Sequence, residues 1–419
     1  MRVQTFVLII QSLSLPQFEP GTLSRESRAN QPTHGANLWS IILINILDLI
    51  INIEEKLCID KSVMPRTSVV VSTLALRFSL GKLASVAEGD AKQELMSVLG
   101  YKSMKMVSDL ILFSVLFVNK IYVNYSDDII PNFYTNSSDS YGVSVEKVGF
   151  KYPNSARTFI NRWVETATYK RITDMLNEDD LDPATTMITI SALHFKPSWE
   201  FPFDFKLTNT RRFRFYNSSI IKSITMMSKT NMFDYLEHEG CKVNEFNIIS
   251  ELNLATQGTF VIFAVPSSPQ GLPDLIEKLY KEPDYITNVM GRIETKLITI
   301  HLPLFQIKTY IDYTGFLQEI GLNAIFSEQS GLNSILQPNS QIKNIQLNKA
   351  KQKVFVEFDE TGTLRHTVDS YGPGEAVGRV PPNLVQQLVI DCPFYFTVNV
   401  QNSENTIYEL FNGAYYGPE

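Results

Sequence analysis

The feature that most constrains this chain is the interruption of a strong strand pattern near its carboxyl terminus. Between Lys353 and Asp359 apolar and polar residues alternate, which predicts a half-buried β-strand. The alternation then stops for about thirty residues that contain several Gly and Pro residues, and a strand pattern returns only at Leu388–Ile390. A loop of that length inside a compact domain is uncommon and is usually functional. We therefore expect a long exposed loop over residues 360–388.

The composition is that of a globular protein and excludes several classes of function. The chain has 419 residues, of which 44% are hydrophobic and 19% charged, and its net charge is −7. This acidic balance argues against nucleic acid as a general partner. The three cysteines, Cys58, Cys241 and Cys392, are scattered and form no CxxC pair, so a disulfide framework is not expected.

The histidines give no indication of an enzyme active site or a metal site. The five of them lie far apart, without an HExxH motif or a nucleophile elbow: His34, His194, His238, His301 and His366. The glycines near Gly372 and Gly378 do not have phosphate-loop spacing, and Pro381 rather than a helix follows them. We predict no enzymatic activity, no cofactor and no metal.

The amino terminus indicates export. Residues 1–15 combine Arg2 with an apolar run and small residues, which predicts a short signal peptide, and residues 16–37 predict a flexible tail. Three sequons fit a secreted glycoprotein, at Asn124, Asn136 and Asn217. The apolar run Leu38–Ile53 carries a polar stripe and is short for a membrane span, so it predicts a packed helix. We expect a secreted monomer without a membrane partner.

The remaining pattern predicts an α+β fold. Helices are expected at 69–80, 91–99, 156–176, 272–279 and 313–320, and strands at 110–123, 187–195, 260–265, 297–311, 388–390 and 394–396. Neither an internal repeat nor a low-complexity linker is present, so residues 38–419 are expected to form one mixed domain.

Several segments, in the same order and at similar spacing, resemble the serpin family. The matching segments are Phe159–Val164 (F-I-N-R-W-V), Ile190–Phe203 (I-S-A-L-H-F-K-P-S-W-E-F-P-F), Leu322–Phe326 (L-N-A-I-F), Phe355–Thr363 (F-V-E-F-D-E-T-G-T), Asp391–Phe394 (D-C-P-F) and Phe411–Gly413 (F-N-G). The resemblance implies roughly eight or nine helices, three β-sheets and an exposed reactive loop. In that family the loop serves as bait for a protease and then inserts as a new strand of the central sheet.

The loop sequence argues against insertion in the family's register. That register begins at the hinge, Glu360 and Gly362, and turns alternate side chains inward, namely Thr363, Arg365, Thr367 and Asp369. The two charges among them would lie about 13 Å apart, too far to pair, and arginine cannot lose its proton. An unpaired buried charge costs several kcal/mol.

Residues near the expected opening of the sheet also depart from the family pattern. Where the family has S-P-x-S, this chain has T-S-V-V at Thr67–Val70, so Val70 replaces a hydroxyl. Ser191 and Gln352 replace an asparagine and a histidine, beside the matching Trp199. We expect their hydrogen-bond network to be rebuilt with other partners. Leu304 replaces the lysine that usually faces Glu360, which predicts that this glutamate lacks its usual partner.

Two observations favour insertion. A register slip of one residue turns different side chains inward, which are acceptable in a dry sheet: Leu364, His366, Val368 and Ser370. The bond Arg379–Val380 suits a trypsin-like protease, as its target or as a nicking enzyme.

The only basic cluster with interleaved aromatic residues lies at Arg211, Arg212 and Arg214. It predicts either a polyanion site or an ordinary solvated strand face.

Two hypotheses follow. The favoured one is a serpin-fold protein that does not inhibit by insertion and acts as a binding, carrier or storage protein. The alternative is a serine-type endopeptidase inhibitor that acts by suicide-substrate loop insertion.

Overall fold

The structure is a computed structural model. It describes residues 67–99, 118–126, 128–134, 142–216, 219–238, 246–253, 259–282, 285, 293–340, 344–360, 385–401 and 407–418. All of them belong to one compact unit, Thr33–Glu419. The expected signal peptide, the tail and the helix at Leu38–Ile53 lie outside the described residues.

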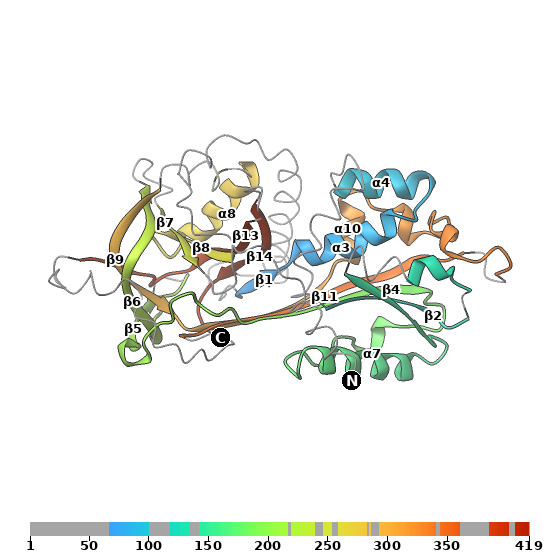
Figure 1. The fold of residues 1–419 in the computed structure, drawn as a ribbon, viewed down its shortest axis with the longest axis horizontal. Coiled ribbons are helices and arrows are strands. Elements are labelled where there is room, and N and C mark those ends of the chain that lie inside the picture. The colour runs from blue at the N-terminus through green and yellow to red at the C-terminus, as the bar shows by residue number, and fades with distance from the viewer. Residues whose placement is uncertain are drawn as a thin grey trace, which may run out of the picture. The chain divides into compact units, whose positions relative to one another are not determined.

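A five-stranded sheet forms the centre of the described fold (Figure 1). Its strands, in spatial order, are β10 (Phe305–Asp312), β11 (Leu347–Phe358), β4 (Met187–Phe195), β2 (Val118–Asn124) and β3 (Val143–Val148). The strands β11 and β4 pair in parallel, whereas β10 with β11 and β4 with β2 pair antiparallel.

The other nine strands form one sheet that is continuous through the long strand β6 (Ile221–His238). One half consists of β12 (Gln386–Val389), β9 (Glu294–Pro303) and β6, and β5 (Asn209–Arg214) pairs with β6 beside this path. The other half runs from β6 through β7 (Phe246–Asn253), β8 (Thr259–Pro266), β13 (Phe394–Gln401) and β14 (Ile407–Tyr415) to β1 (Val69–Val71). Counting each half as a sheet gives the three sheets that the sequence predicted.

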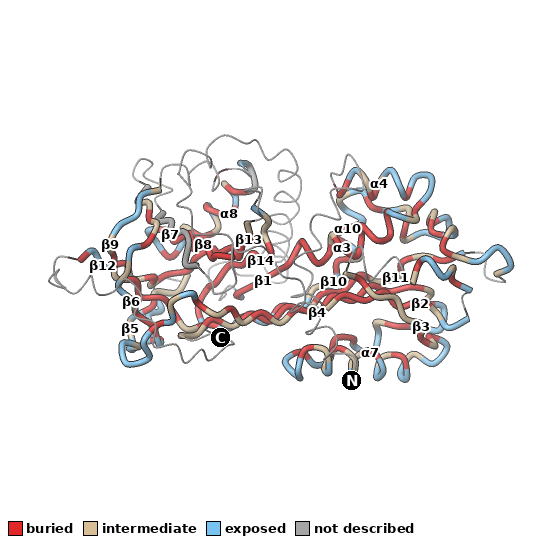
Figure 2. The backbone as a smooth tube through the Cα atoms, in the orientation of Figure 1, coloured by how far each residue is buried: buried red, intermediate tan, exposed pale blue. Residues whose placement is uncertain are grey.

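Helices cover both faces of the central sheet (Figure 1). On one side lie α3 (Thr73–Ala84), α4 (Gly89–Leu99) and α10 (Thr314–Glu319), while α8 (Gly271–Lys281) packs on β8 and β13. On the other side, α7 (Pro153–Ala167) buries Ile160 and Val164 against Tyr122 and Ile190 of the sheet. The helices of the two sides differ in burial: Figure 2 shows that α3 is buried nearly throughout, whereas α7 exposes its outer face.

Most of the expected elements are confirmed. The strand expected at 394–396 extends to Gln401, and three further boundaries are wrong. The expected helix 69–80 begins with a strand, because the three valines of β1 pair with β14 before Ser72 caps α3. The helix expected to reach residue 176 ends at Ala167. Two left-handed residues, Tyr169 and Lys170, turn the chain back there. The strand expected at 297–311 is two strands that separate at Leu304.

Among the helices of the described residues, none has the length and apolar character needed to span a bilayer.

Candidate functional site

The central sheet contains a seam between β4 and β11. These strands pair from Leu347 opposite Met187 to Val356 opposite Phe195, with no strand between them. Because they are parallel, a strand entering between them in the opposite direction would be antiparallel to both. A chain that turns back directly after β11 has that direction. The topology therefore favours a strand supplied by the residues that follow Phe358.

The end of β11 is held by side chains that come from the segment after β4. The Trp199 indole nitrogen donates to the carbonyl oxygen of Asp359 at 2.6 Å, and Lys196 forms an ion pair with the Asp359 carboxylate. The backbone nitrogen of Phe203 donates to the carbonyl oxygen of Glu360 at 2.9 Å. This hydrogen bond fixes the point at which the chain leaves the sheet.

The Glu360 side chain has a partner that the sequence did not reveal. The Thr208 hydroxyl donates to Glu360 Oε1 at 2.7 Å. Glu360 thus has no lysine at Leu304, as the sequence predicted, but a threonine just before β5 binds it instead.

Lys229 of β6 anchors the segment that binds Glu360. Its ammonium group donates to the carbonyl oxygen of Phe201 and lies 5.2 Å and 5.8 Å from the ring centroids of Phe201 and Phe203. Burial lowers the pKa of Lys229 to about 8, against the opposing effect of the Glu200 charge.

A buried hydrogen-bond network lies beneath the seam, centred on Gln352. Its Oε1 accepts from the backbone nitrogen of Ser72 at 3.0 Å and from the Tyr313 hydroxyl at 3.0 Å, and its Nε2 donates to the Ser72 carbonyl oxygen at 2.9 Å. Of the three positions expected to share a network, only Gln352 takes part in these bonds, and its partners are Ser72 and Tyr313. Burial raises the pKa of Tyr313 well above its ordinary value, so this phenol stays a donor.

The other residues expected near the sheet opening have different positions. Ser191 is buried on β4, in register with Gln352 on one side and Asn119 on the other. Val70 is a residue of β1, and its nitrogen donates to the Thr309 hydroxyl at 2.8 Å. A hydroxyl group next to the Gln352 network is that of Ser72, which donates to the Leu410 carbonyl oxygen at 2.7 Å.

The loop itself lies outside the described residues. This applies to Gly362, Thr363, Arg365, Thr367 and Asp369, to the Arg379–Val380 bond, and to the sequon residues Asn136 and Asn217. The remaining sequon residue, Asn124, ends β2 next to Tyr125, which is 71% exposed.

Where the chain is described again, β12 pairs in parallel with β9. His301 of β9 joins three strands, because its Nδ1 lies 2.8 Å from the Ser228 hydroxyl and its Nε2 lies 2.8 Å from Gln387 Oε1. Burial and, to a smaller extent, the charge of Arg211 lower the pKa of His301, whereas the bond to Gln387 opposes them. A neutral His301 that donates from Nε2 fits these partners. It therefore binds β12, the strand that follows the loop, to β9 and β6.

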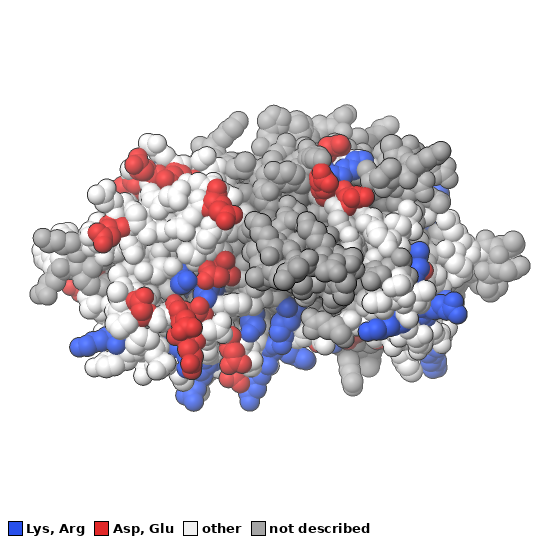
Figure 3. All heavy atoms as spheres, turned by 180° about the vertical axis from the view of Figure 1, so that it is seen from behind, with Lys and Arg blue, Asp and Glu red and all other residues white. Residues whose placement is uncertain are grey.

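The basic cluster of β5 is smaller than the sequence suggested. Arg214 binds Asp391 through two hydrogen bonds, from Nε at 3.1 Å and from Nη2 at 2.6 Å. Its charge is therefore neutralised, and only Arg211 and Arg212 remain of the three expected cations. Figure 3 shows basic and acidic side chains together over the lower left and centre of the face that it presents, while basic side chains predominate at its lower right. Among the described residues, no group of three or more His, Cys, Asp or Glu side chains could hold a metal ion.

Comparison with known proteins identifies the family. A model described as "Serpin (serine protease inhibitor)" matches residues 51–418. The chain belongs to the serpin family. Antichymotrypsin-2 of Bombyx mori is 26% identical over 366 residues, covering 84% of this chain and 92% of that protein. Antitrypsin of the same organism is 26% identical over 368 residues, covering 84% and 88%.

The fold agrees with solved serpin structures. Arabidopsis AtSerpin1 in its native stressed conformation superposes with a TM-score of 0.75 at 21% identity, covering 95% of this chain and all of that one. The family and the α+β fold with three sheets are thus as the sequence predicted.

Proposed function

We propose that this serpin is a serine-type endopeptidase inhibitor that acts by inserting its cut loop into the central sheet. The observation that carries the proposal is the parallel seam between β4 and β11, with the chain leaving β11 at the end of that seam. A strand formed by the loop would complete an antiparallel ladder with both neighbours.

This proposal replaces the favoured prediction of a carrier or storage protein. The matching family model is described as a serine protease inhibitor, and the relatives reported above are named for inhibiting chymotrypsin and trypsin. The contacts of Gln352 and Thr208 add support, because they hold the closed sheet through partners that differ from the family pattern.

The buried-charge objection is met by the loop register. In the register that turns Leu364, Val368 and Ser370 inward, Arg365 and Asp369 lie on the opposite, outer face of the inserted strand. An arginine on that face stays out of the main hydrophobic core and can pair with carboxylates. We propose this register.

The bait bond that fits this mechanism is Arg379–Val380, which suits a trypsin-like protease. Attack by the protease serine on the Arg379 carbonyl carbon releases the amino group of Val380 and leaves an ester that joins the two proteins. Insertion would then carry the attached protease away before water can cleave that ester.

We propose that the protein works outside the cell. The proposal rests on the signal pattern of residues 1–15 and on the sequon at Asn124, which lies at a strand end near the surface.

Mixing the purified protein with trypsin tests the mechanism. We expect a covalent complex that survives denaturant, and the variant Arg379→Ala should no longer form it. The variant Arg365→Ser should behave like the wild type in the proposed register, but should accelerate insertion if Arg365 turns inward. Nicking near Arg379 without a complex, and without a gain in heat resistance, would refute inhibition by insertion.

A further inference from the structure

A segment that lies across the seam is tied to both of its sides. Residues 168–182, here named the return segment, lead from the end of α7 back to the start of β4. Its apolar residues Ile172, Met175 and Leu176 are buried between α7 and the sheet, together with Phe355 of β11. Tyr169, Lys170 and Asp174 have positive φ angles, and no other non-glycine residue of the described chain does. Such strain persists only where surrounding contacts hold it.

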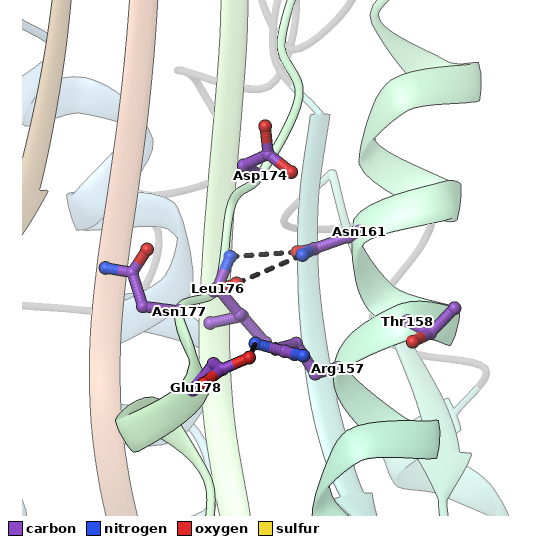
Figure 4. Close-up of a pocket in the computed structure, with 7 residues that line it drawn as sticks. All are labelled: Arg157, Thr158, Asn161, Asp174, Leu176, Asn177 and Glu178. Carbon is purple, nitrogen blue, oxygen red and sulfur yellow. Dashed lines mark hydrogen bonds and ion pairs between the residues drawn. The ribbon is translucent and has the colours of Figure 1, made fainter.

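On one side, the return segment is bound to α7. Asn161 donates to the carbonyl oxygen of Leu176 at 3.0 Å and accepts from its nitrogen at 2.8 Å, and Arg157 lies 3.3 Å from Glu178 (Figure 4). Figure 4 shows that these side chains line a pocket between the helix and the segment. Because the segment also continues into β4, it moves with α7 and β4.

On the other side, the return segment is bound to β10 and β11. Lys353 donates to the carbonyl oxygen of Thr173 at 2.7 Å, and Arg171 lies 3.7 Å from Glu357. The strongest contact is the ion pair of Lys351 with Asp180, since the Lys351 side chain is only 3% exposed and that of Asp180 11%.

Three further groups contact the ion pair, and one of them is the Asp312 carboxylate, 3.4 Å from the Lys351 ammonium group. The Tyr310 hydroxyl contacts Lys351 at 2.5 Å and donates to Asp180 at 3.2 Å, while the nitrogen of Asn177 donates to Asp180 at 2.7 Å. Burial alone would lower the pKa of Lys351, but its bonds to Asp180 and Tyr310 raise that pKa above the ordinary value. This is a satisfied ion pair with little access to water, and breaking it is costly.

Opening the seam must break this pair. A strand inserted between β4 and β11 moves them apart by about 4.8 Å, one strand spacing. A hydrogen bond longer than about 3.5 Å is lost, so Asp180 and Lys351 cannot remain in contact while Asp180 follows β4. Lys351 lies seven residues before Phe358, which places the pair about 23 Å along the seam from its opening end.

We propose that Asp180 and Lys351 set the rate of loop insertion, by fastening the return segment across the seam. The proposal rests on the proposed inhibitory function. Entry of the hinge first breaks the contacts of Glu357 with Arg171 and His194, and the inserting strand stops or slows when it reaches the level of the Asp180–Lys351 pair. An inhibitor with a weaker ion pair inserts its loop faster. It is then cleaved less often as a simple substrate, because insertion is complete before water hydrolyses the ester.

The experiment compares insertion rates after the loop is cut. The full-length protein is exposed to a short pulse of trypsin, and the first-order gain of resistance to urea and heat is followed. We expect Asp180→Asn to insert at least about tenfold faster than the wild type, a change that corresponds to about 1.4 kcal/mol of barrier. Tyr310→Phe, a milder variant, should give a smaller acceleration and serves if Asp180→Asn fails to fold.

A matched control lies on the same strands. Lys349 pairs with Asp312 at 3.4 Å, and this contact joins β10 to β11 without crossing the seam. Lys349→Gln should therefore insert at the wild-type rate. The inference is overturned if Asp180→Asn and Tyr310→Phe insert at the wild-type rate, or if Lys349→Gln is accelerated as much. If the cut wild-type protein gains no resistance to urea or heat, both the proposed function and this inference are refuted. That outcome differs from the two above, in which the wild-type protein still gains resistance.

Discussion

Trp199 donates its indole N–H to the carbonyl oxygen of Asp359, across 2.6 Å and 160 positions of sequence. The ring is 3% exposed and packs on Phe203 and Phe358, so the bond lies in a place that water hardly reaches. A single side chain thus joins the segment after β4 to the end of β11, where the inserting strand would have to start.

The first prediction concerns this bond. Trp199→Phe keeps an aromatic ring but leaves the Asp359 carbonyl oxygen without its donor, which should lower the free energy of unfolding by about 1–3 kcal/mol. Urea unfolding of the intact protein measures it. Trp163→Phe changes the other tryptophan of the described chain, which belongs to α7 and packs on Tyr122, and should leave the cleavage-induced gain in heat resistance unaltered. An unchanged stability in Trp199→Phe would show that the bond is unimportant.

The second prediction concerns Thr208. Thr208→Val has nearly the same shape but cannot donate to Glu360, so the end of β11 loses one anchor. A hydrogen bond to a charged group contributes about 1.5–3 kcal/mol, and partial exposure of Glu360 places the expected loss near the lower value. Urea unfolding of the intact protein should detect this loss. Thr210→Val, on the exposed part of β5, is the control and should be neutral. Equal losses in both variants would contradict a role of Thr208 at the hinge.

The third prediction concerns the network below the seam. Gln352→Leu removes the partner of the Ser72 nitrogen, the Ser72 carbonyl oxygen and the Tyr313 hydroxyl at once. Each buried polar group left unpaired costs about 1–3 kcal/mol, so we expect a loss of at least about 3 kcal/mol and slow spontaneous conversion to an inserted form. Thermal unfolding and native gels over several days report the two effects. Gln306→Leu, on the exposed edge of β10, is the control. It should neither lower the stability nor cause conversion to an inserted form.

Local patterns predicted the elements of this fold well. The alternation and β-branched content of Met187–Phe195 gave both ends of β4 correctly. The start of α3 was missed although its signal was present, because three successive valines favour a strand and Ser72 is an N-cap residue before an apolar run. The early end of α7 had no such signal, since neither Gly nor Pro stands at Tyr169 and Lys170.

The contacts that close the seam could not be predicted from local sequence patterns, for a different reason. Thr208 and Glu360 are 152 positions apart, and Asp180 and Lys351 are 171 apart. Their pairing depends on where whole strands lie, not on the residues around each partner. Family resemblance indicated where a network should be, and substitutions such as Leu304 indicated that it had changed. Only the structure identified the replacements.

The last prediction concerns pH. Burial raises the pKa of Glu409, on β14, to about 8, compared with an ordinary value of 4.5. Between these values the folded state binds a proton that the unfolded state releases. The contribution of Glu409 to stability is therefore fully present below pH 4.5 and is lost as the pH rises toward 8, by up to about 1.4 kcal/mol per pH unit. Glu409→Gln, which is neutral at every pH, should flatten this part of the curve and make the protein more stable than the wild type at pH 8. Urea unfolding at several pH values between 5 and 8 measures both slopes. Parallel curves for the two proteins would mean that Glu409 is ionised in the folded state, and that water or a cation reaches its carboxylate.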